Sequence, residues 1–159
     1  MAVYGEGSSS CYTVAATEGA ACAEAWSLIE YGRLYNWYAV DDARALCPSG
    51  WHVPTDVEWT AMTDFLGGES VAGGQMKTTY GWYNGGNGSN SSGFSGLPGA
   101  YRSSTGSFYN AGSLGLWWSS SPLGSSAWYR SLSYFNEDAT RDNLSRRNGF
   151  SVRCVRDAE

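Results

Sequence analysis

Large aromatic residues recur through a stretch of the sequence that otherwise has the composition of a linker. Residues 81–128 contain one charged residue, Arg102, in 48 positions and are rich in Gly, Ser and Asn. That composition alone is typical of a flexible segment. However, the stretch also contains Trp82, Phe94, Trp117, Trp118 and Trp128, and rings of this size need a packed environment. We therefore expect long ordered loops between short strands.

The length and charge of the chain restrict the class of protein. A chain of 159 residues suffices for one compact domain and is short for two. We expect one domain over 1–159, with a strand and loop region at 1–30. The net charge of −5 and the single lysine, Lys77, argue against a nucleic-acid partner. The sequence has no run of 18 apolar residues, and its first ten residues lack the features of a Sec signal, so we expect no membrane insertion.

Two helices are predicted in the first half. Tyr31, Leu34, Tyr35 and Tyr38 have the i, i+3, i+4, i+7 spacing of an amphipathic helix, which predicts a helix over 30–46. A second helix should begin at Thr55, since Thr55 and Glu58 form a capping-box pattern. Its expected apolar face is Trp59, Met62, Phe65 and Leu66, and Gly67–Gly68 should end it.

The second half changes to a period of two. Trp128, Arg130, Leu132 and Tyr134 alternate with residues of the other face, and Phe150, Val152 and Cys154 do the same. Two helices followed by short antiparallel strands with long loops predict an α+β fold.

The cysteines allow two interpretations. Cys11, Cys22, Cys47 and Cys154 are even in number and lack zinc-finger spacing. They could form a bridge within the N-terminal loop, Cys11–Cys22, and a long-range bridge, Cys47–Cys154. The alternative is four buried free thiols in a reducing compartment.

Three further features favour structural roles over chemistry. The lone histidine, His52, is interpreted as a turn residue that hydrogen-bonds a neighbouring backbone group rather than as part of a triad or metal site. Asp41–Asp42 and Glu137–Asp138 lack EF-hand spacing, so we interpret them as solvated charge. The Gly-rich segment GGNGSNSSG (85–93) lacks a GK[ST] ending and is expected to be a loop, not a phosphate site.

The tract from Tyr101 to Ser145 is rich in Tyr, Ser, Gly and Asn. Antibody binding sites use the same residues, because Tyr gives stiff amphipathic contact area and Ser or Asn give adaptable hydrogen bonds. A polar, loop-rich sheet surface without a ligand is the other interpretation. Trp117 and Trp118 are assigned to the core.

Four segments resemble a known family. They are YGRLYNWYAV (31–40), LCPSGWHVPTDVEWT (46–60), GSFYNAGSLGLWWSSS (106–121) and NGFSVRCVRD (148–157). Together they resemble the Fibrobacter major paralogous domain family over nearly everything after residue 30. That family is similar to the formylglycine-generating enzyme group. The resemblance implies a C-type-lectin-like fold with paired N- and C-terminal strands, two helices and a loop-rich face.

The resemblance to the enzyme group does not extend to its chemistry. Those oxidases use a pair of cysteines upstream of the final strand to hold copper, and the matching stretch, Ser131 to Arg147, contains no cysteine. Cys154 matches only a structural strand cysteine. We therefore expect no catalytic residues, no cofactor and no metal.

A sharper resemblance is to the variable proteins of diversity-generating retroelements, which end in a similar tail after a Ser/Tyr/Asn-rich tract. There a reverse transcriptase mutates adenines, so that AAC codons become NNC, which never encodes Trp, Glu or Lys. Trp117, Trp118 and Trp128 would then be fixed scaffold, and 99–157 the variable, ligand-facing region. The residues this implies for ligand binding are Tyr101, Ser103, Ser104, Ser107, Tyr109, Ser113, Leu114, Leu116, Leu123, Ser125, Tyr129, Ser131, Ser133, Tyr134, Phe135, Asn136, Asp138, Thr140, Asp142, Asn143, Leu144 and Ser145.

The expected function is therefore that of a non-enzymatic ligand-binding protein, diversified by a retroelement and displayed on a virion or cell surface. Its partner would be a protein or glycan on a host or neighbouring cell. The alternatives are a secreted adhesive or structural domain without diversification, and a formylglycine-generating-type oxidase.

Three structural expectations accompany this function. Cys47 and Cys154 should lie within bridging distance, and Trp117 and Trp128 should be largely buried. The third concerns a set that should share one exposed face: Tyr109, Tyr129, Ser131, Ser133, Phe135 and Asn143.

Overall fold

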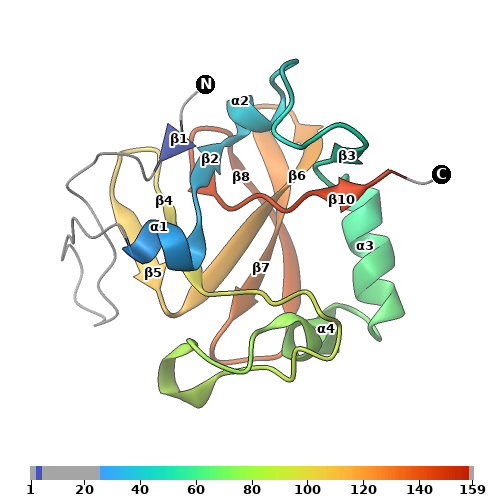
Figure 1. Cartoon of the computed structure of the whole chain (residues 1–159), viewed down its shortest axis with the longest axis vertical. Coiled ribbons are helices and arrows are strands. Elements are labelled where there is room, and N and C mark those ends of the chain that lie inside the picture. Colours follow the sequence, from blue (N-terminus) through green and yellow to red (C-terminus); the bar gives the residue numbers. More distant parts are fainter. Residues whose placement is uncertain (1–2, 5–25, 158–159) are drawn as a thin grey trace.

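The computed structural model describes residues 3–4 and 26–157, which form a mixed α+β fold (Figure 1). The helices are α1 (Trp26–Tyr31), α2 (Trp37–Val40), α3 (Asp56–Phe65) and α4 (Glu69–Met76), with a 3₁₀ turn η1 (Tyr83–Gly85). The strands are β1 (Val3–Tyr4), β2 (Leu34–Asn36), β3 (Trp51–His52), β4 (Gly99–Arg102), β5 (Phe108–Ala111), β6 (Leu114–Leu123), β7 (Ser126–Ser133), β8 (Ala139–Ser145), β9 (Gly149–Phe150) and β10 (Val155–Arg156).

The main sheet is mixed. Its strand order is β1-β2-β9-β4-β6-β7-β8, and β5 pairs with β4. β4 and β6 are parallel, whereas β6, β7 and β8 form an antiparallel meander. A separate two-stranded sheet joins β3 and β10. The expected pairing of the terminal strands with each other is therefore wrong for the described part of the chain, because β1 pairs with β2 and β10 pairs with β3.

The predicted helix over 30–46 is also wrong. α1 ends at Tyr31, and Gly32 adopts a left-handed φ of +73° that turns the chain into β2. The short helix α2 then begins after Asn36, whose side chain accepts a hydrogen bond from the Ala39 amide. The spacing that suggested one long helix is thus divided among the end of α1, the strand β2 and the four-residue helix α2.

Helix α3 confirms the prediction at its N-terminus. Thr55 accepts a hydrogen bond from the Glu58 amide, and the Glu58 carboxylate accepts one from the Thr55 amide. Trp59 is buried against the sheet, but Phe65 is 88% exposed, so its assignment to the apolar face was wrong. The buried side of α3 carries Trp59 and Thr63, and Phe65 lies off that side.

The strand predictions are largely confirmed. β7 covers most of the alternating run at 128–135, and residues 85–93 carry no strand or helix beyond the end of η1. The run at 150–155 is divided between β9 and β10, and Ser151 bridges to Trp117 between them.

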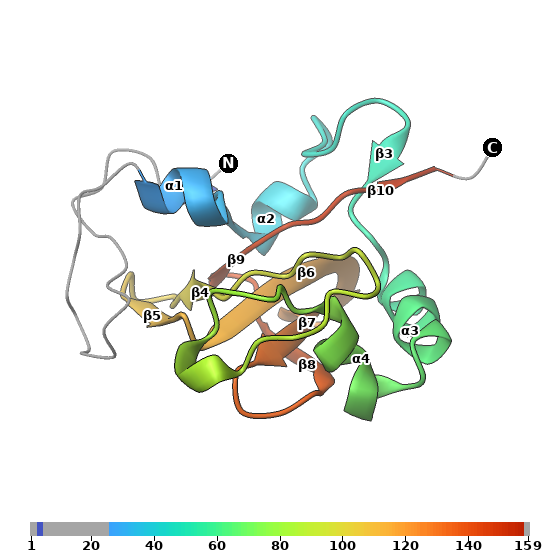
Figure 2. The ribbon, with the colours of Figure 1, turned by 60° about the horizontal axis from the view of Figure 1, so that its bottom comes forward.

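The core lies on both sides of the main sheet. On one side, Trp59, Met76, Trp82 and Trp117 pack together, and Figure 2 shows α4 and the segment that follows it across β6 and β7. On the other side, Trp118 stacks on Phe150 with ring centroids 4.1 Å apart.

The tryptophan predictions hold in part. Trp117 and Trp118 are buried, as expected. Trp128 is half-buried, with the Arg141 guanidinium 3.5 Å from its ring centroid.

The predicted Cys47–Cys154 disulfide is confirmed, with a Cα–Cα distance of 5.8 Å and a sequence separation of 107 residues. Such a bridge is consistent with an extracellular protein. Cys11 and Cys22 lie outside the described residues. Among the helices that the structure describes, none is long and apolar enough to cross a membrane.

Candidate functional site

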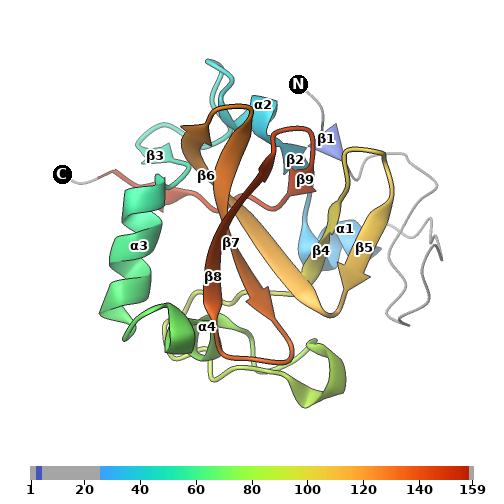
Figure 3. The same cartoon turned by 180° about the vertical axis from the view of Figure 1, so that it is seen from behind.

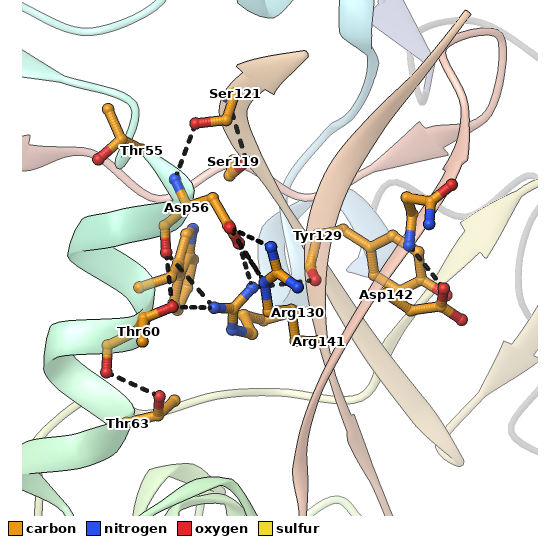
Figure 4. A network of polar contacts seen from close by, with 12 residues as sticks. Thr55, Asp56, Thr60, Thr63, Ser119, Ser121, Tyr129, Arg130, Arg141 and Asp142 are labelled. Atoms are coloured by element: carbon orange, nitrogen blue, oxygen red, sulfur yellow. Dashed lines mark hydrogen bonds and ion pairs between the residues drawn. The ribbon is translucent and has the colours of Figure 1, made fainter. Parts of the chain in front are cut away.

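The alternation of side chains along β6, β7 and β8 gives the main sheet two different faces. Arg130 and Arg141 are directly opposite each other and point to α3, whereas Tyr129 and Asp142 are opposite each other and point away from it (Figure 4). The second face continues through Ser131 and Thr140, and through the Tyr101–Tyr109 pair on β4 and β5. We call Tyr101, Tyr109, Tyr129, Ser131, Thr140 and Asp142 the tyrosine face. In Figure 3 no helix of the described chain crosses β6, β7 and β8 on the side turned to the viewer.

The tyrosine face rests on a packed aromatic floor. The Tyr129 ring lies 4.9 Å from the buried ring of Phe150 and 6.1 Å from that of Trp118. Tyr101 contacts Phe150 edge-on at 6.0 Å and lies 5.6 Å from Tyr109, which is 38% exposed. Buried neighbours therefore hold the rings in place. Tyr109 and Thr140 are exposed at the surface, and Ser131 is half-buried.

The ionisation of Tyr129 reports on this packing. Burial, the negative charge of Asp142 and a hydrogen bond to that carboxylate raise the pKa of Tyr129 to about 12. We expect Asp142→Asn to lower the Tyr129 pKa, because the negative charge that opposes phenolate formation is lost. Tyrosine ring-carbon NMR titration measures this change, and Ser145→Ala on the same strand is the control. An unchanged Tyr129 pKa in Asp142→Asn would show that Asp142 does not act on the phenol.

The raised pKa of Tyr129 determines how the contribution of this group to the stability of the fold depends on pH. The folded pKa of Tyr129 lies above the ordinary value of 10.0. This group's contribution to stability is therefore complete below pH 10 and is lost as the pH rises toward the folded pKa.

The candidate ligand residues do not share one face, contrary to the expectation. Asn143 is opposite Trp128 on the α3 side, and Phe135 lies in the turn after β7. Leu116 and Ser133 are 5% and 8% exposed and are not available as surface contacts. The candidates that the structure leaves exposed are Ser104, Ser107, Tyr109, Leu123, Ser125, Phe135, Thr140, Asp142, Leu144 and Ser145. The half-buried ones are Tyr101, Ser103, Ser113, Leu114, Tyr129, Ser131, Tyr134, Asn136, Asp138 and Asn143.

An ion-pair network beneath the sheet was not predicted. Arg130, fully buried, places Nη1 2.7 Å from Asp56 Oδ1, and Arg141 places Nη2 2.7 Å from Asp56 Oδ2 (Figure 4). Arg130 also donates to the Thr60 hydroxyl at 2.9 Å. Burial alone would raise the pKa of Asp56, but the hydrogen bonds and charges of Arg141 and Arg130 hold it below its usual value. The network links the start of α3 to the face of β7 and β8 that points toward this helix.

The sequence indicates one member of this network, Arg130, but not its partner. Arg130 lies between the apolar residues Trp128 and Leu132 on the same predicted strand face. A charge on a predicted buried face requires a partner. Nothing local identifies that partner as Asp56, which is 74 residues away.

His52 has side-chain partners rather than the predicted backbone partner. Its Nδ1 lies 2.6 Å from Asp157 Oδ1 and its Nε2 2.8 Å from Glu58 Oε1. The imidazolium can donate to both carboxylates, which ties the end of β10 to the capping box of α3. Of the two predicted acidic pairs, Asp42 forms an exposed ion pair with Arg44.

We expect the pKa of His52 to lie above 6.5, because hydrogen bonds to Asp157 and Glu58 stabilise the charged ring. The stability this provides is complete below pH 6.5 and is lost as the pH rises through the folded pKa. Because the pair is exposed, the contribution is small.

The measurement is an NMR titration of the ring protons of the single histidine. Asp157→Asn should lower the His52 pKa, whereas the control Asp64→Asn should not. A wild-type pKa at or below 6.5 would contradict the prediction.

Comparison with known families gives one match. A family model described as Fibrobacter succinogenes major domain (Fib_succ_major) matches residues 7–156. No curated protein and no solved structure shows a significant match to the chain.

Proposed function

Because the chain belongs to the Fibrobacter succinogenes major domain family, we propose that it is a non-enzymatic ligand-binding module whose recognition surface is the tyrosine face. The observation that carries this proposal is the combination of accessible Tyr109, Thr140 and Asp142 with a buried floor of Trp118 and Phe150. Aromatic and hydroxyl side chains held in place lose little entropy on binding, so contacts made there are retained as affinity.

Retroelement diversification is the second element of the proposal. Ten of the candidate positions are exposed, and substitutions at such sites usually change stability by less than about 0.5 kcal/mol. The positions assigned to the fixed scaffold include the buried Trp117 and Trp118. Diversification requires surface residues that can change above buried residues that stay the same. The exposed candidate positions and the buried tryptophans provide this arrangement.

We further propose a C-type-lectin-like architecture and display outside the cell, on a virion or a cell surface, with a protein or glycan partner. Two substantial helices beside a mixed sheet with long loops support the first. The Cys47–Cys154 bridge supports the second.

An oxidase of the formylglycine-generating type is the less favoured alternative. Cys154, which directly precedes β10, is bonded to Cys47, and this bond supports a structural role for Cys154. The stretch Ser131 to Arg147 contains no second reactive thiol. An adhesive domain without diversification differs from the proposal only in whether the surface varies.

Gene sequencing tests the proposal. Copies of the gene from one population should differ at adenine-bearing codons within residues 99–157, and a reverse-transcriptase gene with a near-identical template repeat should lie nearby. Invariant codons and no such repeat would contradict diversification and favour the adhesive alternative.

A further inference from the structure

Three loop tips meet at the end of the sheet away from α2. The Tyr83 amide, at the start of η1, donates to the Gly112 carbonyl in the β5–β6 turn at 2.7 Å. The Tyr134 amide, just after β7, donates to the Ser113 carbonyl of the same turn at 3.0 Å. Gly86 lies against the Tyr134 backbone so closely that any side chain there would overlap it. These contacts fix the tips relative to one another, and Figure 3 shows them at the lower end of the molecule.

The tips present a connected group of aromatic rings. Tyr83 and Tyr134 meet edge-on at 5.4 Å, and Tyr134 and Phe135 meet edge-on at 5.6 Å. Phe135 is 71% exposed and Tyr83 is 42% exposed. We call Tyr83, Tyr134 and Phe135 the aromatic tip. Large rings exposed side by side on a protein surface are unusual unless they serve binding.

A buried lysine holds the aromatic tip in place. The Lys77 amine donates to the Ser133 carbonyl at 2.9 Å and to the Asn136 carbonyl at 2.8 Å, on either side of Tyr134 and Phe135. Lys77 is 3% exposed, and burying its charge is costly unless such partners are present. The turn that carries the two rings is therefore ordered before any ligand arrives.

The side chains around the rings are polar, and the charged ones among them are the two carboxylates of the β7–β8 turn. The exposed amide side chain of Asn84 lies in η1, and that of Asn110 lies in β5, two residues before the Gly112 carbonyl that bonds Tyr83. Arg102 is the only charged residue in 81–128. Glu137 and Asp138 are the charged residues of the β7–β8 turn, and Asp138 already accepts a hydrogen bond from Asn136.

This combination suits an uncharged polar ligand with a flat apolar side. A pyranose ring has such a side, formed by its C–H groups, while its hydroxyls both donate and accept, as an amide side chain does. We propose that the aromatic tip is a binding site for neutral carbohydrate, with a pyranose packed on Phe135 or Tyr83 and its hydroxyls bonded to Asn84 or Asn110. The site lies on η1 and on the turn that follows β7, so it is separate from the tyrosine face and does not depend on the function proposed for that face.

NMR titration of the full chain with neutral tetrasaccharides tests the proposal, using cellotetraose, maltotetraose, mannotetraose and chitotetraose. At least one should bind with a Kd of about 1 mM or below. Phe135→Ala should weaken that binding at least about tenfold, as expected for a central aromatic contact, and Tyr83→Ala should weaken it too. Phe65→Ala is the matched control, because Phe65 is even more exposed, at 88%, but lies on α3. Thermal unfolding should show that each variant folds as the wild type does.

Two results would overturn the proposal. One is the absence of binding by every tetrasaccharide at about 10 mM, which would favour a protein partner for the aromatic tip. The other is binding that Tyr109→Ala abolishes and Phe135→Ala leaves intact. That result would move the sugar to the tyrosine face, which would support the proposed function while rejecting this inference.

Discussion

Replacing Asp56 by Asn should lower the free energy of unfolding by about 3–5 kcal/mol, the cost of leaving a buried ion pair without one partner. The Arg130 side chain is fully buried and that of Arg141 is 36% exposed, and both guanidinium groups bond the Asp56 carboxylate. An amide cannot neutralise either of them. Urea unfolding at neutral pH measures the loss.

The control for this variant is Asp64→Asn, which removes an exposed carboxylate from the same helix. Its effect should stay within about 0.5 kcal/mol.

The difference in unfolding free energy between wild type and Asp56→Asn should become smaller in acid. The folded pKa of Asp56 is lowered, so its contribution is present above the unfolded pKa and is lost as the pH falls through the folded one. A loss below about 1 kcal/mol at neutral pH would mean that Asp56 does not compensate the buried arginine.

Removing the Cys47–Cys154 bridge should have an effect of similar size. The bridge closes a sequence separation of 107 residues, and chain entropy assigns about 4.7 kcal/mol to a loop of about 100 residues, with measured losses of about 2–5 kcal/mol. Cys47→Ala and Cys154→Ala should be combined, so that neither thiol is left to pair elsewhere. Urea unfolding without reductant gives the value.

The loss of this bridge should act first on the small β3–β10 sheet. That sheet contains two residue pairs, and an isolated two-stranded sheet is marginal in water. Amide exchange at Asp157, whose backbone donates to the Gly50 carbonyl, should therefore accelerate in the double variant. A change in unfolding free energy below about 1 kcal/mol would contradict the expected role of the bridge.

The sequence predicts those elements whose signals are local. The capping box of α3 needs only Thr55 and Glu58, and the strand β7 needs only its own alternation. The prediction of a helix over 30–46 was wrong because the same apolar spacing also fits β2 followed by α2. The left-handed Gly32 and the cap at Asn36 decided between the two.

The candidate site shows the same limit. Alternation separates Tyr129 and Ser131 from Arg130, but the pairing of Asn143 with Trp128 depends on the register of β8. The β7–β8 turn and the packing of β8 against α4 set that register. The spacing of residues in the sequence reveals neither of them. The aromatic tip likewise joins Tyr83 of η1 to Tyr134, 51 residues later, through tertiary contacts alone.

The central claim is that the tyrosine face is a recognition surface whose side chains can change while the fold persists. Its most direct test is a pair of display libraries. The tyrosine-face library is randomised at four members of that face and at the exposed Leu144, which follows on the same side of β8: Tyr109, Ser131, Thr140, Asp142 and Leu144. The control library is randomised at the exposed α3 and α4 positions Val57, Ala61, Asp64, Phe65 and Ser70. Both are selected against the same panel of folded proteins. We predict folded binders from the tyrosine-face library at no less than about ten times the frequency of the control library, consistent with aromatic contacts in a supported surface. Equal yields from the two libraries, or mostly unfolded members of the first, would contradict the claim.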